Sequence, residues 1–197
     1  MPTNSATAAI KPLATPFDLQ SRPLSWKIAA VVFGTLLLTV SSYIEVPMVP
    51  VPVTMQTFAV ALVGALYGWR LGALTVMAWL GQAMLGMPVL SGGAGGAQHF
   101  MGPTAGYLFA FPLAAALCGW LAERGWNGNR PIRAFTGMLL SNAVCLLFGA
   151  AWLALMIGLE QAIALGVTPF LVGAVLKSAL GAAVLKLMAR GRMRPAG

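Results

Sequence analysis

Long apolar stretches, separated by short polar or glycine-rich joints, follow one another along almost the whole chain. A helix needs about 20 apolar residues to cross a bilayer, and these stretches lack the alternating apolar and polar positions of a membrane β-barrel strand. The pattern predicts an all-α integral membrane protein, built as a bundle of six transmembrane helices. The predicted spans are residues 26–44, 56–69, 71–85, 105–122, 134–157 and 169–188.

Composition supports this class and divides the chain into three parts. Of the 197 residues, 59% are hydrophobic and only 8% are charged, whereas a soluble domain carries about 25% charged residues. So few charges do not cover a water-exposed surface. We expect a disordered cytoplasmic tail over residues 1–25, a membrane domain over 26–189, and a basic cytoplasmic tail over 190–197.

The basic residues give the predicted bundle an orientation. The chain has 12 Lys and Arg against 4 Asp and Glu, and all the basic residues except Lys177 fall in the tails, joints or span ends of one side. Because positive residues collect on the cytoplasmic side, both termini are predicted to be cytoplasmic, in a multi-pass protein of the inner (plasma) membrane. This placement accounts for the positive charge without nucleic acid, which we do not expect as a partner.

Lys177 is the exception, because it lies near the middle of the last predicted span. A lysine at that depth costs roughly 2.5–3.5 kcal/mol on insertion scales and is a candidate functional residue by default. Gly173 and Ala174 precede it by one helical turn, so it shares a face with small residues. Lys177 is therefore predicted to point into the bundle. Two roles remain open, namely an anchor for an anionic ligand and an ion pair with a carboxylate.

The sequence lacks the motifs of most catalytic and cofactor sites. The stretch "SGGAGGAQ" (residues 91–98) lacks the third glycine of a dinucleotide-binding turn, and one histidine with two distant cysteines makes no metal site. No nucleophile and base are placed as in an intramembrane serine protease. We therefore expect no enzyme activity, cofactor or metal. A compact bundle with a buried cation and a glycine-rich extracytoplasmic loop suits the capture of a small anionic molecule.

Several segments, in this order, resemble the BioY family of biotin-specific substrate-binding subunits of energy-coupling-factor (ECF) transporters. The resemblance extends over residues 26–188. The segments that carry it are "VPVTMQTF" (51–58), "GALYGWRLGAL" (64–74), "GMPVLSGGAGG" (86–96), "GPTAGYLFAFPLAA" (102–115) and "PFLVGAVLKSALGAA" (169–183).

The resemblance implies six membrane helices and an extracytoplasmic biotin pocket, closed by the joints between spans one and two and between spans three and four. It also implies a transmembrane coupling subunit and two cytosolic ATPases as partners. Lys177 matches the lysine of the family pattern P-F-x-x-G-D-x-x-K and is implied as a ligand contact. Ala174 stands where the pattern has Asp, which leaves open a related small anionic vitamin in place of biotin.

We therefore expect a set of substrate-binding residues around the buried lysine and the glycine-rich loop. The set is Lys177, Ala174, Gly173, Asn142, Gln98, Tyr107, Gln82, Gly93, Gly95 and Gly96. Ala30 and Gly34 form a small-xxx-small pair in the first span and are a candidate docking face for a coupling subunit. The alternative is a membrane interaction protein without transport function, in which such faces bind partner helices and Lys177 pairs with a partner carboxylate.

Overall fold

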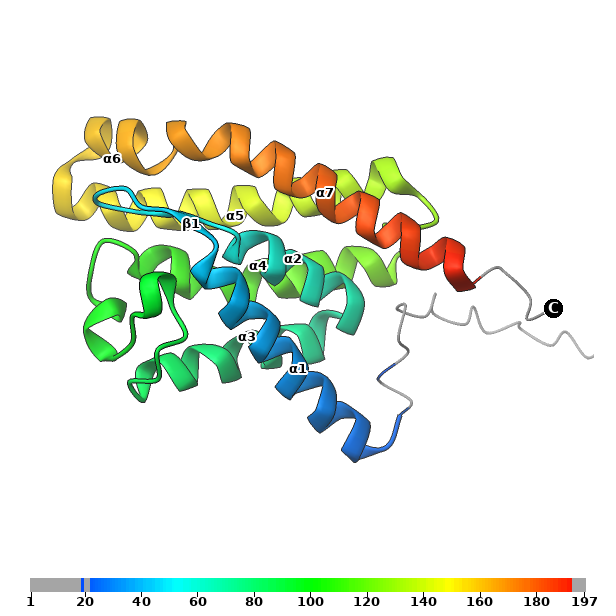
Figure 1. Ribbon diagram of the computed structural model, residues 1–197. Coiled ribbons are helices and arrows are strands. Elements are labelled where there is room, and N and C mark those ends of the chain that lie inside the picture. The colour runs from blue at the N-terminus through cyan, green and yellow to red at the C-terminus, as the bar shows by residue number, and fades with distance from the viewer. Residues whose placement is uncertain (1–18, 20–21, 193–197) are drawn as a thin grey trace, which may run out of the picture.

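The computed structural model describes Leu19 and residues 22–192, and it is a bundle of helices with one small hairpin. Figure 1 shows the long helices α4, α5 and α7 running side by side, with α1 crossing them at an angle. The helices are α1 (Leu24–Tyr43), α2 (Gln56–Tyr67), α3 (Trp69–Met84), α4 (Ala105–Glu123), α5 (Pro131–Ile157), α6 (Leu159–Gly166) and α7 (Thr168–Arg192).

The predicted helical fold is confirmed, although some boundaries differ. The first helix begins at Leu24, inside the predicted tail, and the last continues to Arg192. The joint after α5 contains a short helix, α6, that the sequence did not predict. Among the described residues, four segments are long and apolar enough to cross a membrane, namely α1, α4, α5 and the run Leu159–Gly191, whereas α2 is shorter. The count of six spans therefore stays a prediction.

Helix α2 is short but central, and most of its residues are buried. Its close approach to neighbouring helices depends on residues without bulk. A Cβ at Gly64 would collide with the carbonyl of Ala115 in α4, and one at Gly72 in α3 would lie 2.9 Å from the Gly64 Cα. Gly64 and Gly72 thus mark a face where the backbones of neighbouring helices pack directly on one another.

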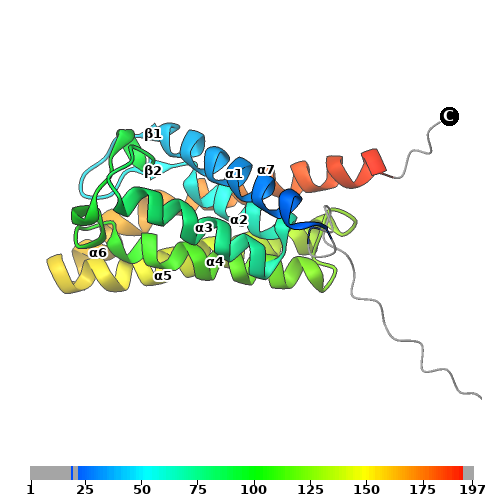
Figure 2. The ribbon, with the colours of Figure 1, turned by 90° about the horizontal axis from the view of Figure 1, so that it is seen from below.

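The two ends of the bundle differ in character. One end holds the start of α1, the α2–α3 and α4–α5 junctions and the end of α7 (Figures 1 and 2). The other end holds α6, the loop between α3 and α4, and a hairpin of β1 (Glu45–Val46) and β2 (Val53–Thr54). In this antiparallel hairpin Glu45 lies opposite Thr54.

The glycine-rich loop between α3 and α4 is compact and contains two short 3-10 helices, η2 (Ser91–Gly93) and η3 (Ala97–Phe100). Gly92, Gly93 and Gly96 all have positive φ values. This backbone region is readily accessible only to glycine, so the loop's composition follows from its conformation. We call residues 85–104 the lid.

Candidate functional site

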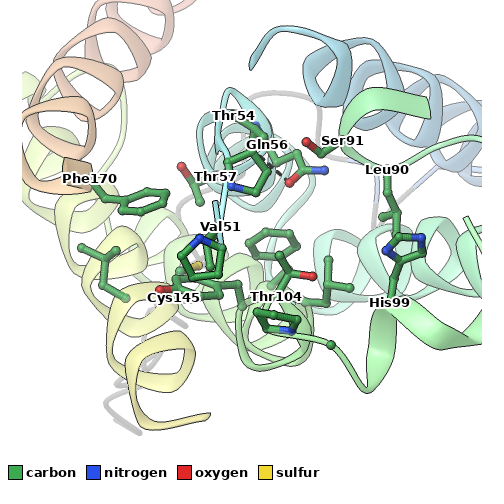
Figure 3. Close-up of a pocket in the computed structure, with 18 of the residues that line it drawn as sticks. Val51, Thr54, Gln56, Thr57, Leu90, Ser91, His99, Thr104, Cys145 and Phe170 are labelled. Atoms are coloured by element: carbon green, nitrogen blue, oxygen red, sulfur yellow. Dashed lines mark hydrogen bonds between the residues drawn. The ribbon is translucent and has the colours of Figure 1, made fainter. Parts of the chain in front are cut away.

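A cavity of about 420 Å³ lies at the hairpin end of the bundle, between α2, α4, α5 and α7. Figure 3 shows its lining, with Thr54 and Gln56 above, Phe170 on one side and His99 on the other. Small-molecule pockets typically have volumes of roughly 300–1,000 Å³ and mostly apolar walls with a few polar groups. The cavity therefore has the size and the mixed lining of a site for a small organic molecule.

Helix directions distinguish the floor of this pocket from its mouth. Helix α7 runs away from the hairpin end, so Phe170 lies near the mouth and Lys177, two turns later, lies deepest on that helix. Helix α5 runs the opposite way, which makes Asn142 its deepest lining residue. The floor therefore holds two polar side chains, Lys177 on α7 and Asn142 on the neighbouring helix α5.

Lys177 is 8% exposed and donates two hydrogen bonds at the floor. Its Nζ atom lies 2.8 Å from the carbonyl oxygen of Thr54 and 3.0 Å from the hydroxyl oxygen of Thr57. Both acceptors are neutral, and none of the described residues that line the pocket is Asp or Glu. An ammonium has three N–H donors, so one donor and the net charge remain available to a ligand.

Gly173 supports this placement of the lysine. A Cβ at Gly173 would lie 3.5 Å from the Lys177 Cε, which is an ordinary van der Waals contact. The lysine stem thus passes over the glycine one turn earlier on α7, consistent with the shared face that the sequence predicted.

A buried polar chain holds the beginning of α2 in place. The Gln56 side chain donates to the Ser42 hydroxyl at 3.0 Å and accepts from the Thr54 hydroxyl at 3.0 Å. Ser42 in turn donates to the Leu38 carbonyl of α1. Because each member has partners, the chain fixes the hairpin and the first turn of α2 as one unit.

Asn142 is 4% exposed, and a second chain fixes its amide. Its Nδ2 donates to the Met138 carbonyl at 3.0 Å and to the Ser178 hydroxyl at 3.3 Å. Ser178 donates to the Ala174 carbonyl at 2.7 Å. This chain therefore joins α5 to α7 beside Lys177.

Aromatic rings form the apolar walls. The Tyr107 ring stacks on Phe170 with a centroid distance of 6.1 Å, and Phe111 stacks on Trp79 at 6.1 Å. The Tyr107 hydroxyl donates to the Gly166 carbonyl at 2.6 Å, so only its ring is offered to the pocket. Flat, rigid walls of this kind suit an apolar ring system.

The lid is held over the pocket by side chains from three helices and the hairpin. Tyr43 in α1 donates to the Pro88 carbonyl at 2.6 Å, Trp79 in α3 to the Val89 carbonyl at 3.2 Å, and Trp152 in α5 to the Gly102 carbonyl at 3.0 Å. The Ser91 hydroxyl donates to the Glu45 carboxylate of β1. The lid is thus attached near both of its ends, over residues 88–91 and at Gly102.

The structure brings half of the predicted binding residues to the pocket. Lys177, Ala174, Asn142, Gln98 and Tyr107 line it. The other five lie nearby without lining it. Gly93 contacts Tyr43, Gly95 packs on the backbone of Met87, Gly96 lies beside Gln98, Gly173 lies under the Lys177 stem, and Gln82 is half-buried near the end of α3.

Several lining residues were not predicted. In the sequence, nothing distinguishes these residues from other single residues in apolar surroundings. They are Thr54, Gln56, Thr57 and Phe170. The pair Thr54 and Gln56 offered one usable clue, because two polar side chains flank the beginning of a short apolar helix.

The Ala30 and Gly34 pair lies on the packed side of α1. A Cβ at Gly34 would lie 2.6 Å from a Thr75 side-chain carbon and 3.0 Å from the Tyr67 ring, both within this chain. Ala30 is half-buried against the same cluster. The pair thus provides an internal contact between α1, α2 and α3, and a docking role for it stays a prediction.

Fold and site together define a helical membrane protein with a pocket for a small molecule. Comparison with known proteins specifies the family. The sequence matches the profile of the BioY family over residues 12–194, and the chain belongs to that family.

Two relatives and one solved structure illustrate the match. The "Probable biotin transporter BioY" of Pyrococcus horikoshii is 37% identical over 153 residues, which cover 78% of this chain and 90% of the relative. The "Biotin transporter BioY" of Rhizobium etli is 35% identical over 146 residues, which cover 71% of this chain and 78% of the relative. Both are named as transporters and not as enzymes.

The crystal structure of "the S-component for biotin from an ECF-type ABC transporter" has the same fold as this chain, with a TM-score of 0.75. It is 23% identical, and the match covers 89% of this chain and 96% of that one.

Proposed function

We propose that this chain captures biotin and is the substrate-specific subunit of an ECF-type vitamin transporter. The observation that carries the proposal is the pocket itself, in a chain of the BioY family. It combines stacked aromatic walls with a polar floor of Lys177 and Asn142. Biotin has an apolar bicycle, a hydrogen-bonding ureido group and a carboxylate tail, which match such a lining.

The proposed orientation places the pocket on the extracytoplasmic side of six spans, with both termini in the cytoplasm. Arg70, Arg124 and Arg130 lie at the junctions of the end opposite the lid (Figure 1). Because positive residues favour the cytoplasmic side, this supports an inner (plasma) membrane protein that receives its ligand from outside.

Cysteine labelling tests the orientation. Ala97→Cys in the lid and Asn129→Cys in the α4–α5 turn both introduce thiols at exposed positions, while the native Cys118 and Cys145 are buried. In intact cells a membrane-impermeant maleimide should label the first variant, and the second only after permeabilisation. The reverse pattern would place the pocket in the cytoplasm.

The proposed partners are a transmembrane coupling subunit and cytosolic ATPases. The fold shared with the biotin S-component of an ECF-type ABC transporter supports this assembly. In proteoliposomes, biotin uptake should depend on ATP and on co-reconstituted partners. Equal uptake by the isolated chain would mean that it works alone.

Binding to the purified protein tests the substrate. Calorimetry or radiolabelled biotin should give a dissociation constant below the micromolar range. Lys177→Met should weaken binding by about tenfold or more, as expected when a charged hydrogen-bond donor is lost. Lys186→Met, an exposed lysine on the same helix, is the matched control and should bind normally. Failure of the unaltered protein to bind biotin would favour a related small anionic vitamin or a non-transport role.

A further inference from the structure

The amide orientation of Asn142 is fixed by its partners. The Met138 carbonyl is only an acceptor, so it requires the NH₂ group of the amide on its side. The same Nδ2 atom also donates to Ser178, whose own proton is directed to the Ala174 carbonyl. Both hydrogen bonds of Asn142 therefore use Nδ2, and neither uses Oδ1.

The amide oxygen must then face the cavity. In the described part of the chain, no fully buried side-chain nitrogen or oxygen lacks a hydrogen-bond partner. Oδ1 has no partner within the protein, so it borders the open volume that Asn142 lines. The result is an unpartnered acceptor on a side chain that is 96% buried, since Asn142 is 4% exposed.

The floor also holds a donor. Lys177 lines the same cavity as Asn142, and it directly precedes Ser178, which bonds the Asn142 amide. Ala174, which also lines the floor, contributes no polar side-chain atom. The floor therefore presents one positively charged donor, the Lys177 ammonium, and one neutral acceptor, the Asn142 oxygen.

We infer that Asn142 is a specificity-determining residue that accepts a hydrogen bond from an N–H group of the ligand, while the adjacent carbonyl of that ligand accepts from Lys177. A neutral N–H–C=O unit, such as one edge of a cyclic urea, matches this donor and acceptor pair. A carboxylate does not, because its oxygens would face the Asn142 oxygen with no proton between them. Ser178 is a positioning residue that keeps the amide from rotating.

This inference rests on the proposed function, and it assigns the end of biotin that reaches the floor. The ureido group lies at Lys177 and Asn142, and the carboxylate lies toward the mouth. A ligand without the N–H would leave the Asn142 oxygen buried and unsatisfied, which is more costly than the mere loss of a contact.

The test compares biotin with an analogue in which one ureido N–H is replaced by oxygen. The unaltered protein should bind biotin about tenfold or more tightly than the analogue. Asn142→Ala should lose a similar factor for biotin and should no longer discriminate. Asn129→Ala, at an exposed asparagine, should leave both affinities unchanged. Thermal unfolding of each variant reports whether it is folded.

Two further variants separate a role in recognition from one in packing. Ser178→Ala keeps Asn142 but frees its amide, and it should reduce discrimination more than stability. The double variant Asn142→Ala with Ala174→Asp should regain part of the biotin affinity, because it restores an acceptor beside Lys177.

The outcomes are distinct. Equal affinity of the unaltered protein for biotin and the analogue would overturn the inference, as would an Asn142→Ala variant that binds both more weakly but keeps the discrimination. If the unaltered protein binds neither molecule, the proposed function fails, and the inference fails with it.

Discussion

Glu45 and Thr54 lie opposite each other in the β1–β2 hairpin, and between them they join the lid to the floor of the pocket. The Glu45 carboxylate accepts from Ser91 of the lid, and the Thr54 carbonyl accepts from Lys177 of the floor. The hairpin therefore contacts both the lid and the floor, and we expect a displacement of one to affect the other. The following predictions concern this connection and the walls beside it.

Removal of the lid contact should speed up ligand release. Ser91→Ala deletes the hydroxyl that holds the lid to β1, and a hydrogen bond to a charged group is worth about 1.5–3 kcal/mol. We expect the dissociation rate of bound biotin to rise by roughly tenfold or more, with a small change in association. Stopped-flow displacement measures both rates. Ser25→Ala on the exposed start of α1 is the control, and an unchanged dissociation rate in Ser91→Ala would contradict the prediction.

Loss of one lysine acceptor should weaken both the site and the fold. Thr57→Val keeps the side-chain volume but removes the hydroxyl that Lys177 reaches at 3.0 Å. A buried donor left without its acceptor costs about 1–3 kcal/mol, so the melting temperature and the biotin affinity should both fall. In the control Thr136→Val, the lost hydroxyl bonds only the carbonyl of Ile132 in its own helix. Equal melting temperatures for the two variants would refute a structural role for Thr57.

The wall at Tyr107 should tolerate no added bulk from α5. A Cβ at Gly149 would overlap the Tyr107 ring, so Gly149→Ala must displace the ring that stacks on Phe170. Overpacking of this kind costs about 1–3 kcal/mol, and it should also weaken biotin binding. Gly81→Ala in α3 meets nothing within 4 Å, and there alanine should stabilise the helix by about 0.5–1 kcal/mol. Thermal unfolding in detergent compares the two variants.

A larger residue at Gly34 should destabilise the isolated chain. Gly34→Val introduces methyl groups against Thr75 and Tyr67, which already lie within 3.0 Å of a Cβ there. The melting temperature should fall in the absence of any partner protein. Phe33→Leu changes the neighbouring position, which is 65% exposed, and should have little effect. An unaltered melting temperature in Gly34→Val, with loss of transport alone, would support the docking role that the sequence predicts.

The sequence predicted the long helices because their apolar runs end at charged or glycine-rich joints. It missed α6 because the joint between Gly158 and Thr168 is short and lacks Lys and Arg, which is typical of an extracytoplasmic loop between two spans. Helix α2 was predicted as a short span, but its central position depends on glycine contacts with α3 and α4 that only the packed structure reveals.

For the site, the sequence identified Lys177 because a charge within an apolar run is conspicuous. It could not identify Thr54 and Thr57 as the partners of that lysine, since more than 100 residues separate them from it along the chain. The glycines of the lid were assigned to ligand contact, yet the structure uses Gly93 and Gly95 for close packing within the protein. The glycines indicated an unusual backbone conformation, and the sequence did not specify which surface they would face.

The anchors of the lid have a mechanical consequence. Tyr43, Trp79 and Trp152 each hold a different lid carbonyl, and each comes from a different helix. Displacement of the lid as one body would break all three bonds together. The barrier to that movement would then be set by the joint release of the anchors and not by the flexibility of any one glycine.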